Sequence, residues 1–377
     1  RFCCGGVVEN VSTSVFFSSN GGSYHIAFPN YSKDEIETLT TACKPATFGK
    51  GQKTVLDPEY RNALALFPPS FALSFHPHDH NILTQIQQLM VPESDGLKAE
   101  LYQLNLYGPG GHFKSHVDTP RGADMIGSLV VSLPSAHEGG QLLVRKGKDE
   151  HTFDFGKEDP KGIKIQWAAF FADCEHEILP VTTGFRVTVT YLLKSVGKSD
   201  LASCVKVSYP ELLQGIFSQM EDTTFHPHGT TLIFGCLHSY ANDALAAAST
   251  DPAKALKGAD ALMYGALKAA GLETQLRAIV EIDDDESGEQ RYWIPNEIPT
   301  EIQTTTLYEE SESTYVRTEF PGKYLPLDAV WCTTEKGTSF LAAVAGSYGN
   351  DISCDSIYFE AVLIVNLPPA ASLVRQW

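Results

Sequence analysis

Apolar and polar residues alternate through the middle of the chain, a pattern that is typical of short β-strands. In KAELYQLNLY (98–107), Gln103, Asn105 and Tyr107 fall on one face, whereas Leu104 and Leu106 fall on the other. Further β-rich runs follow between Gly, Pro and Asp turns, at 127–134, 139–147, 151–156, 163–172 and 184–193. This spacing predicts a β-sandwich or barrel rather than alternating β-α-β units.

Two helical patterns precede these strands. SKDEIETLTTAC (32–43) predicts a short helix in which Ser32 is the N-cap and Glu35 completes a capping box. DHNILTQIQQLM (79–90) carries apolar residues at helical spacing. We expect both helices to pack against one sheet of the β region.

The pattern changes after about residue 195. Strands are predicted at 230–240, 275–285 and 358–369, and a helix at 251–271 with Gly271 as its C-cap. We therefore predict an α+β chain that is mainly β, with one domain at 1–197, whose β core spans about 98–193, and an α+β domain at 198–377. The later strands permit a degenerate second barrel, and equally an α+β lid or a dimerisation domain.

Charge and cysteine content narrow the range of partners and compartments. The 377 residues carry a formal net charge of −18, and no run of Lys or Arg is visible. Proteins that bind nucleic-acid phosphates or anionic membranes normally present a basic patch, so we expect neither partner. The eight cysteines are scattered without a CxxC pair, which predicts free thiols in a reducing compartment, cytoplasmic with the nucleus left open.

No segment predicts membrane insertion or secretion. No apolar run reaches 18 residues, so we expect no transmembrane helix. The start, RFCCGGVVEN, lacks the layout of a signal peptide. Because no initiator Met is present, a removed signal stays open.

The segment YGPGGHFKSHVDTP (107–120) holds the strongest candidate chemistry. His116 and Asp118 are two residues apart, so on a strand they would face one ligand together. A lone His-x-Asp pair is usually a surface strand pair, but His176, after the run IKIQWAAFFA, supplies a third donor. Two histidines and one carboxylate form the facial triad that binds Fe(II) and leaves coordination positions open.

A basic residue follows at a suitable place. Arg186 lies ten residues after His176 and shares its strand face with Thr188. Guanidinium binds carboxylate in bidentate fashion, so this pair would hold the far end of a dicarboxylate. Tyr107, nine residues before His116, would add a phenol hydrogen bond to the same carboxylate.

With these residues the chain resembles the Fe(II)- and 2-oxoglutarate-dependent oxygenases of the prolyl 4-hydroxylase type. The family pattern is Tyr-x-x-Gly-x-x-aromatic-x-x-His-x-Asp, then a distal His, then a basic residue ten positions on. It is matched here by Tyr107, Gly110, Phe113, His116, Asp118, His176 and Arg186. More loosely, HVDTPRG, HEGGQLLVR, WAAFFADCEHE and YGND resemble long oxygenase-domain proteins that are abundant in fungi.

The resemblance implies a fold, a site and cofactors. The fold is a double-stranded β-helix (jelly roll) with flanking helices. His116, Asp118 and His176 would hold Fe(II), and Arg186 with Thr188 and Tyr107 would hold 2-oxoglutarate, with O2 as the second co-substrate and ascorbate as a reductant. Asn105 sits where related nucleic-acid-demethylating oxygenases place an Asn near the co-substrate.

The resemblance leaves the substrate open. Phe113 stands where prolyl hydroxylases usually have Tyr, and Arg186 where many have Lys. We expect hydroxylation of an unactivated C–H bond, in a prolyl or other peptidyl side chain or, alternatively, in a small metabolite. A catalytically silent scaffold is the third hypothesis. Asp118 argues against a halogenase, and the charge of −18 against a nucleic-acid demethylase. Oligomeric state cannot be read from the sequence.

Overall fold

The chain divides into two compact units by its internal contacts, Arg1–Gly197 and Lys198–Trp377, and each is described by itself. The computed structural model describes residues 1–50, 53–118, 124–156, 164–197, 201–208, 210–222, 224–240, 244–245, 251–284, 289–299, 303–307, 312–333, 339–347 and 354–369. Arg121 and the YGND segment (348–351) lie outside the described residues.

The N-terminal unit is built mainly from strands. Its helices are α1 (Lys33–Ala42), the 3-10 helix η1 (Pro77–His80) and α2 (Ile82–Met90). Its strands are β1 (Cys3–Glu9), β2 (Thr13–Ser19), β3 (Gly22–Phe28), β4 (Lys44–Pro45), β5 (Phe48–Lys50), β6 (Lys53–Val55), β7 (Arg61–Asn62), β8 (Leu64–Leu66), β9 (Phe71–Leu73), β10 (Leu97–Tyr107), β11 (His112–His116), β12 (Met125–Ser132), β13 (His137–Gly139), β14 (Leu142–Lys146), β15 (Asp149–Phe153), β16 (Lys164–Phe171), β17 (Glu175–Ile178), β18 (Val181–Gly184) and β19 (Arg186–Ser195).

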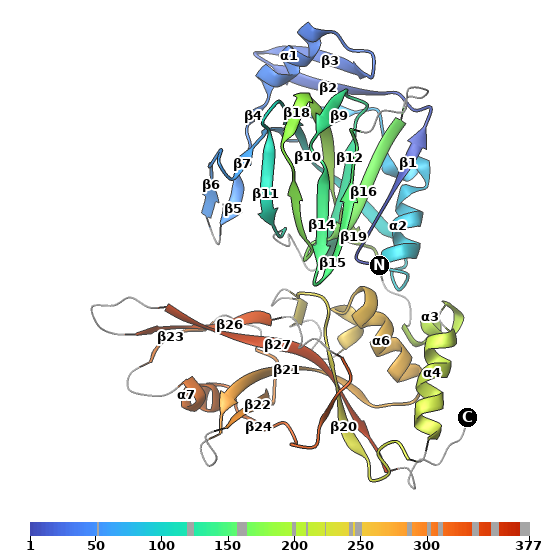
Figure 1. Ribbon diagram of the computed structural model, residues 1–377, viewed down its shortest axis with the longest axis vertical. Helices are drawn as coiled ribbons and strands as arrows, with labels where there is room; N and C mark the ends of the chain where they lie inside the picture. The colour runs from blue at the N-terminus through green and yellow to red at the C-terminus, as the bar shows by residue number, and fades with distance from the viewer. Residues whose placement is uncertain are drawn as a thin grey trace. The chain divides into compact units, whose positions relative to one another are not determined.

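Two facing sheets make the core of this unit (Figure 1). The seven-stranded sheet has the order β1-β16-β12-β19-β10-β8-β4, and the five-stranded sheet has the order β15-β14-β17-β11-β7. The chain switches sheets as it advances, with β10, β12, β16 and β19 in the larger sheet and β11, β14 and β17 in the smaller. This alternation is the double-stranded β-helix, or jelly roll, and the expected fold class is confirmed.

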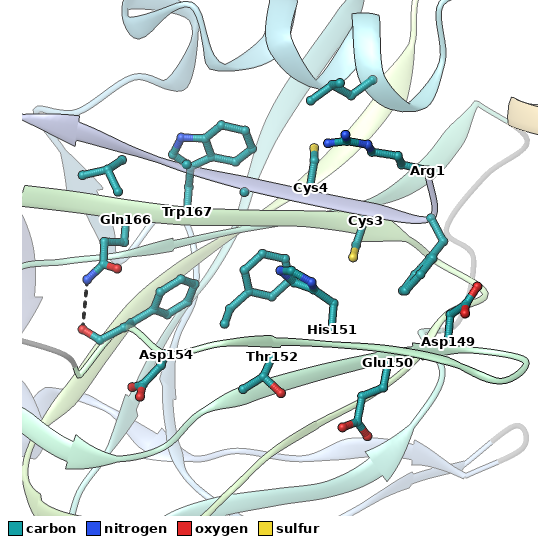
Figure 2. A pocket seen from close by; sticks show the side chains of 17 residues that line it. Arg1, Cys3, Cys4, Asp149, Glu150, His151, Thr152, Asp154, Gln166 and Trp167 are labelled. Atoms are coloured by element: carbon teal, nitrogen blue, oxygen red, sulfur yellow. Dashed lines mark hydrogen bonds between the residues drawn. The ribbon is translucent and has the colours of Figure 1, made fainter.

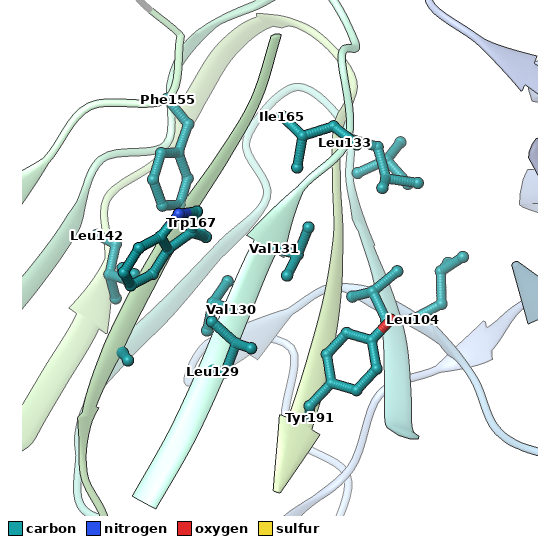
Figure 3. Close-up of a cluster of buried hydrophobic side chains, with 14 of the residues drawn as sticks. Leu104, Leu129, Val130, Val131, Leu133, Leu142, Phe155, Ile165, Trp167 and Tyr191 are labelled. Carbon is teal, nitrogen blue, oxygen red and sulfur yellow. The ribbon is translucent and has the colours of Figure 1, made fainter. Parts of the chain in front are cut away.

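Apolar side chains from alternate strand positions fill the space within this unit. Figure 3 shows part of the cluster, in which Leu129 and Val131 of β12 lie near Trp167 of β16 and Tyr191 of β19. Leu129, Val131 and Trp167 are at most 2% exposed. Burying such side chains stabilises the sandwich by roughly 1.5–3 kcal/mol each.

The first strand joins the core sheet, which the local sequence pattern does not predict. β1 pairs with β16 along its whole length, from Cys3 opposite Phe170 to Glu9 opposite Lys164. A Cβ on Gly5 would lie 2.6 Å from the Phe153 ring, so glycine permits this close approach.

The two predicted helices are present, but they do not share a sheet. α1 begins after Ser32 with the expected capping box, and it contacts β2 and β3 of a three-stranded sheet ordered β3-β2-β9. α2 contacts β10 and β1 of the seven-stranded sheet. The expectation of one common sheet was wrong because the strands at 13–28 form a sheet of their own.

The C-terminal unit combines helices with a second sheet. Its helices are α3 (Leu201–Ser208), α4 (Pro210–Glu221), the 3-10 helix η2 (Pro252–Lys254), α6 (Gly258–Ala269) and α7 (Glu312–Glu319). Its strands are β20 (Thr230–Gly235), β21 (Thr274–Asp283), β22 (Gln290–Pro295), β23 (Gln303–Leu307), β24 (Gly322–Tyr324), β25 (Val330–Trp331), β26 (Ser339–Ser347) and β27 (Cys354–Leu367).

The sheet of this unit is mostly antiparallel and is centred on β27. Its main path is β23-β26-β27-β21-β22-β24; β20 also pairs with β27, and β25 pairs with β20. Helices α3, α4 and α6 pack on one another, and α6 also contacts β21. The C-cap of α6 is Ala270, one residue earlier than predicted, and Gly271 follows it with φ +74°. In the described part of the chain, no helix is long and apolar enough to cross a membrane.

Candidate active site

A cavity of about 430 Å³ opens between the two sheets of the jelly roll. One wall comes from β10, β12, β16 and β19, and the other from β11, β14 and β17. Gln103, Asn105 and Tyr107 of β10 pair directly with Thr190, Thr188 and Arg186 of β19, and all six side chains line the cavity. The alternation read from the sequence therefore separates a cavity-lining face from a core face.

Strand pairing brings the proposed metal ligands together. β11 and β17 are antiparallel neighbours, and their register sets His116 opposite His176. Asp118 follows two residues after His116. One ligand atom from each of these three side chains lies within 4.8 Å of the others, and within the described residues this is the single such cluster of His, Cys, Asp and Glu.

Both imidazole rings are oriented by backbone carbonyl groups. Nδ1 of His116 lies 2.8 Å from the carbonyl oxygen of Lys114, and Nδ1 of His176 lies 3.0 Å from that of Cys174. A carbonyl oxygen only accepts, so each Nδ1 carries the proton and each Nε2 keeps its lone pair for a metal. Burial, with His176 as the second cause, lowers the pKa of His116, which keeps the ring neutral.

The carboxylate of Asp118 is also fixed in direction. The hydroxyl of Ser128 donates to Asp118 Oδ2 at 2.6 Å, and Oδ1 lies 3.7 Å from Nε2 of His176. Ser128 comes from β12, so the larger sheet orients a proposed metal ligand that follows β11. Such outer hydrogen bonds are common around metal ligands and tune their affinity.

Arg186 is buried without a charged partner. Its side chain is 1% exposed, and its Nε and Nη2 have no hydrogen-bond partner among the described residues. The guanidinium carbon lies 5.3 Å from the ring centre of Tyr107, the residue paired with it on β10. Burial lowers the pKa of Arg186 to about 10, so the group stays charged at neutral pH.

A glycine makes room for this arginine. A Cβ on Gly140, which has φ +69°, would lie 2.8 Å from Cδ of Arg186. Any larger residue there would press on the arginine stem and strain its own backbone. The Gly-Gly pair before Gln141 thus shapes the site, whereas Gln141 itself is not among the described residues that line the cavity.

Two weaker candidates differ in how their polar groups are used. Thr188 is 1% exposed and lines the cavity beside Arg186. Asn105 also lines it, but its side chain is held within the protein. Asn105 Oδ1 accepts from Arg61 and from Gln103, and Nδ2 donates to Thr190. Asn105 therefore has little hydrogen-bonding capacity left for a co-substrate.

Several polar residues of the cavity were not predicted from the sequence, and they include Arg61, Gln103 and Ser128. Gln103 and Ser128 share the inward alternation of their strands, a signal that could have found them. Arg61 lies on the two-residue strand β7, where no periodicity exists to read. Of the residues that flank His116, Lys114 is exposed, and the imidazole of His112 contacts the carbonyl groups of Gly110 and Glu59.

A second cavity, of about 830 Å³, lies where edge strand β1 faces edge strand β15 (Figure 2). Its wall includes Cys3, Cys4 and Trp167 on one side and His151 on the other. Burial raises the pKa of Cys3 to about 11 and that of Cys4 to about 12, so neither thiol is a ready nucleophile. Of the two cavities, the smaller one therefore holds the candidate catalytic side chains.

Comparison with known proteins identifies the region around that cavity. The family model described as 2OG-Fe(II) oxygenase superfamily matches residues 102–194. No curated protein matches the chain.

Two solved structures illustrate the structural likeness. A prolyl-4-hydroxylase from Pseudomonas putida is 18% identical, with 43% of this chain and 82% of that chain covered and a TM-score of 0.28. A 2OG-Fe(II) oxygenase family oxidoreductase from Burkholderia pseudomallei is 16% identical, with 45% and 83% covered and a TM-score of 0.26. TM-scores this low do not bear on activity, so the assignment rests on the family match.

The side chains in the cavity fit the cofactors of that family. Two imidazoles and one carboxylate are donors that suit Fe(II). The N–H groups of Arg186 that no described residue binds suit a carboxylate of 2-oxoglutarate. Residues 102–194 form a domain of the 2OG-Fe(II) oxygenase superfamily, and the chain that carries it is a 2-oxoglutarate-dependent dioxygenase with Fe(II) and 2-oxoglutarate as its cofactors.

Proposed function

We propose that the N-terminal unit hydroxylates an unactivated C–H bond of a prolyl or other peptidyl side chain. His116, Asp118 and His176 hold Fe(II), and Arg186 with Thr188 and Tyr107 holds the far carboxylate of 2-oxoglutarate. One observation carries the proposal. Three ligand atoms converge within 4.8 Å in the same cavity as a buried guanidinium, two of whose nitrogen atoms have no partner in the described part of the chain.

The protein residues supply orientation and charge. The carbonyl groups of Lys114 and Cys174 set the ring tautomers, and Ser128 sets the carboxylate. When bound, Fe(II) and 2-oxoglutarate supply the oxidative step, in which O2 is consumed, 2-oxoglutarate becomes succinate and CO2, and the substrate gains a hydroxyl group.

Apolar residues complete the cavity wall and limit side reactions. Val130, Leu142, Phe170 and Ile178 line it beside the ligands, and each is at most 8% exposed. Such a wall excludes water from the reacting centre and strengthens the electrostatic contacts inside it.

A small metabolite is the second candidate substrate. The cavity volume of about 430 Å³ falls within the range of pockets that enclose small molecules. Every described residue that lines it belongs to the N-terminal unit, which supports a site within this unit. In either case we propose a reducing compartment, because five of the six described free cysteines are buried thiols.

The test is succinate formation from 2-oxoglutarate by the Fe(II)-loaded protein. It is measured without substrate and then with a panel of proline-containing peptides and small metabolites. The wild type is compared with His116→Ala, and His112→Ala serves as the matched control because His112 lies outside the ligand cluster.

We expect turnover in the wild type and in His112→Ala, and a loss of more than about a hundredfold in His116→Ala, because even outer partners of metal ligands contribute 10- to 100-fold. Stimulation by one member of the panel identifies the substrate class. Absence of turnover in every condition, with Fe(II) binding unchanged in His116→Ala, would favour the scaffold hypothesis.

A further inference from the structure

A second buried arginine lines the same cavity and has no role in the proposed reaction. Arg61 is 9% exposed, and its Nε has no hydrogen-bond partner among the described residues. Its Nη1 donates to the carbonyl of Thr47, and its Nη2 donates to Asn105 Oδ1 at 2.8 Å. Both partners are neutral, so they fix the direction of the guanidinium but leave its charge unbalanced.

The position of Arg61 connects it with the metal ligands. Its guanidinium carbon lies 4.4 Å from the ring centre of Phe113, and the Phe113 ring stacks on His116 with 3.6 Å between ring centres. Asn105, which holds Arg61, is two residues from Tyr107 along β10, a step of about 7 Å. Arg61 thus lies on the side of the cavity that carries His116, and its partner Asn105 is one same-face step from Tyr107, the residue that pairs with Arg186.

Counting formal charges shows that this arginine is in excess. Of the described residues lining the cavity, only Asp118 is acidic. The charge of Asp118 and the two of 2-oxoglutarate balance Fe(II) and Arg186, which leaves one positive charge on Arg61. A buried charge without a counter-charge is costly, so its natural complement is an anionic group brought by a ligand.

We propose that Arg61 is a specificity-determining residue that binds a carboxylate of the primary substrate. This inference rests on the proposed function, because it assumes that Arg186 serves 2-oxoglutarate. The carboxylate belongs either to a free acid or to an acidic side chain next to the target residue of a peptide. The same guanidinium geometry serves both sources, and matched ligands separate them.

The experiment measures binding rather than turnover. Protein loaded with Mn(II), which replaces the iron without oxidative turnover, and with 2-oxoglutarate is titrated by calorimetry with two matched pairs. The first is N-acetyl-L-proline against its carboxamide. The second is acetyl-Gly-Pro-Glu-amide against acetyl-Gly-Pro-Gln-amide. Binding of 2-oxoglutarate by the same protein is measured first, and its absence would overturn the proposed function rather than only the role of Arg61.

We expect the wild type to prefer the acid over the amide by about tenfold or more in one pair, as for a charge-assisted hydrogen bond. Arg61→Gln should bring this ratio close to one and change the 2-oxoglutarate Kd by less than about threefold. Arg61→Lys should keep part of the preference, because the charge stays while the planar fork is lost.

A second variant separates charge from folding. Asn105→Asp keeps Arg61 and sets a carboxylate at hydrogen-bond distance from it, so the internal ion pair should remove the preference for acids as Arg61→Gln does. A preference that survives both variants would overturn the inference. So would a 2-oxoglutarate Kd that rises in Arg61→Gln as far as in Arg186→Gln, or failure of both pairs to bind to protein that holds 2-oxoglutarate.

Discussion

Each unit of the chain buries a charged side chain, and the two are treated in opposite ways. In the C-terminal unit, the carboxylate of Asp260 is 4% exposed and accepts from the backbone N–H groups of Leu237 and His238 and from the hydroxyl of Tyr240, at 2.6–3.0 Å. In the N-terminal unit, Arg186 is 1% exposed and keeps two nitrogen atoms without partners among the described residues.

The difference separates structure from function. A buried charge whose partners come from its own chain holds a loop in place, as Asp260 holds the segment after β20. A buried charge without partners stabilises nothing by itself, since the cost of desolvation is not offset. We propose that a ligand of opposite charge explains its retention. Four variants, each with a control or a second substitution, test this distinction, and they follow in order of expected effect.

The largest effect is expected from Arg186→Met. Removing one member of a buried charge pair costs 2–5 kcal/mol of binding, so the Kd for 2-oxoglutarate should rise by about a thousandfold. The melting temperature should stay the same or rise, because a Met of similar volume replaces an unpaired buried charge. Calorimetry and thermal unfolding of the Mn(II)-loaded protein measure the two quantities.

Arg145→Met is the matched control for this variant. Arg145 is paired with Glu150, Glu175 and Glu177, so its charge is already balanced within the protein. Its replacement should leave the Kd for 2-oxoglutarate unchanged. If Arg186→Met lowered the melting temperature and left the Kd for 2-oxoglutarate unchanged, Arg186 would have a structural role. The contrast with Asp260 would then be wrong.

Asp260→Ala should show the reverse behaviour. Three donors lose their acceptor, and unsatisfied buried groups cost about 1–3 kcal/mol each, so we expect a loss of roughly 3 kcal/mol in the stability of the C-terminal unit. Urea unfolding measures this loss, and the Kd for 2-oxoglutarate is measured on the folded variant. Asp260→Asn keeps one oxygen acceptor and should lose less. A changed Kd in either variant would mean that the C-terminal unit acts on the active site.

Ser128→Ala tests the hydrogen bond that orients the carboxylate of Asp118. Loss of the hydrogen bond to Asp118 should weaken Fe(II) or Mn(II) binding by about 10- to 100-fold, as is typical of groups that orient metal ligands. Ser132→Ala is the control, because Ser132 is also buried on β12 but is not among the described residues that line the cavity. Equal metal affinity in the two variants would show that Ser128 does not contribute to metal binding.

The sequence was informative wherever the signal was local. The strands β10, β12, β14, β15, β16 and β19 fall in runs predicted from the local pattern, whereas β11 and β17, which carry His116 and His176, do not. The residues proposed to bind iron and 2-oxoglutarate follow from their spacing along the chain. Their convergence in one cavity depends on register between strands that are distant in the chain, such as β11 with β17. The pairing of β1 with β16 and the position of Arg61 on β7 have no local signal, because both are determined by long-range contacts. What the ligand-binding residues do stays a prediction that the variants test.

The smallest effect is expected where structure is most local. The Ser32 hydroxyl caps α1 by accepting from the backbone N–H of Glu35, and the Glu35 carboxylate accepts from the backbone N–H of Ser32. Ser32→Ala should therefore cost about 1 kcal/mol of stability in the N-terminal unit. Thr38→Ala, which removes only a hydroxyl bonded to the preceding helical turn, should cost less. Neither change should alter the Kd for 2-oxoglutarate, since α1 packs on β2 and β3 and does not line the cavity. A changed Kd would show that the three-stranded sheet β3-β2-β9 under α1 is coupled to the active site. The Ser32 hydroxyl, whose hydrogen bond is made within the protein, would then affect ligand binding as well as stability.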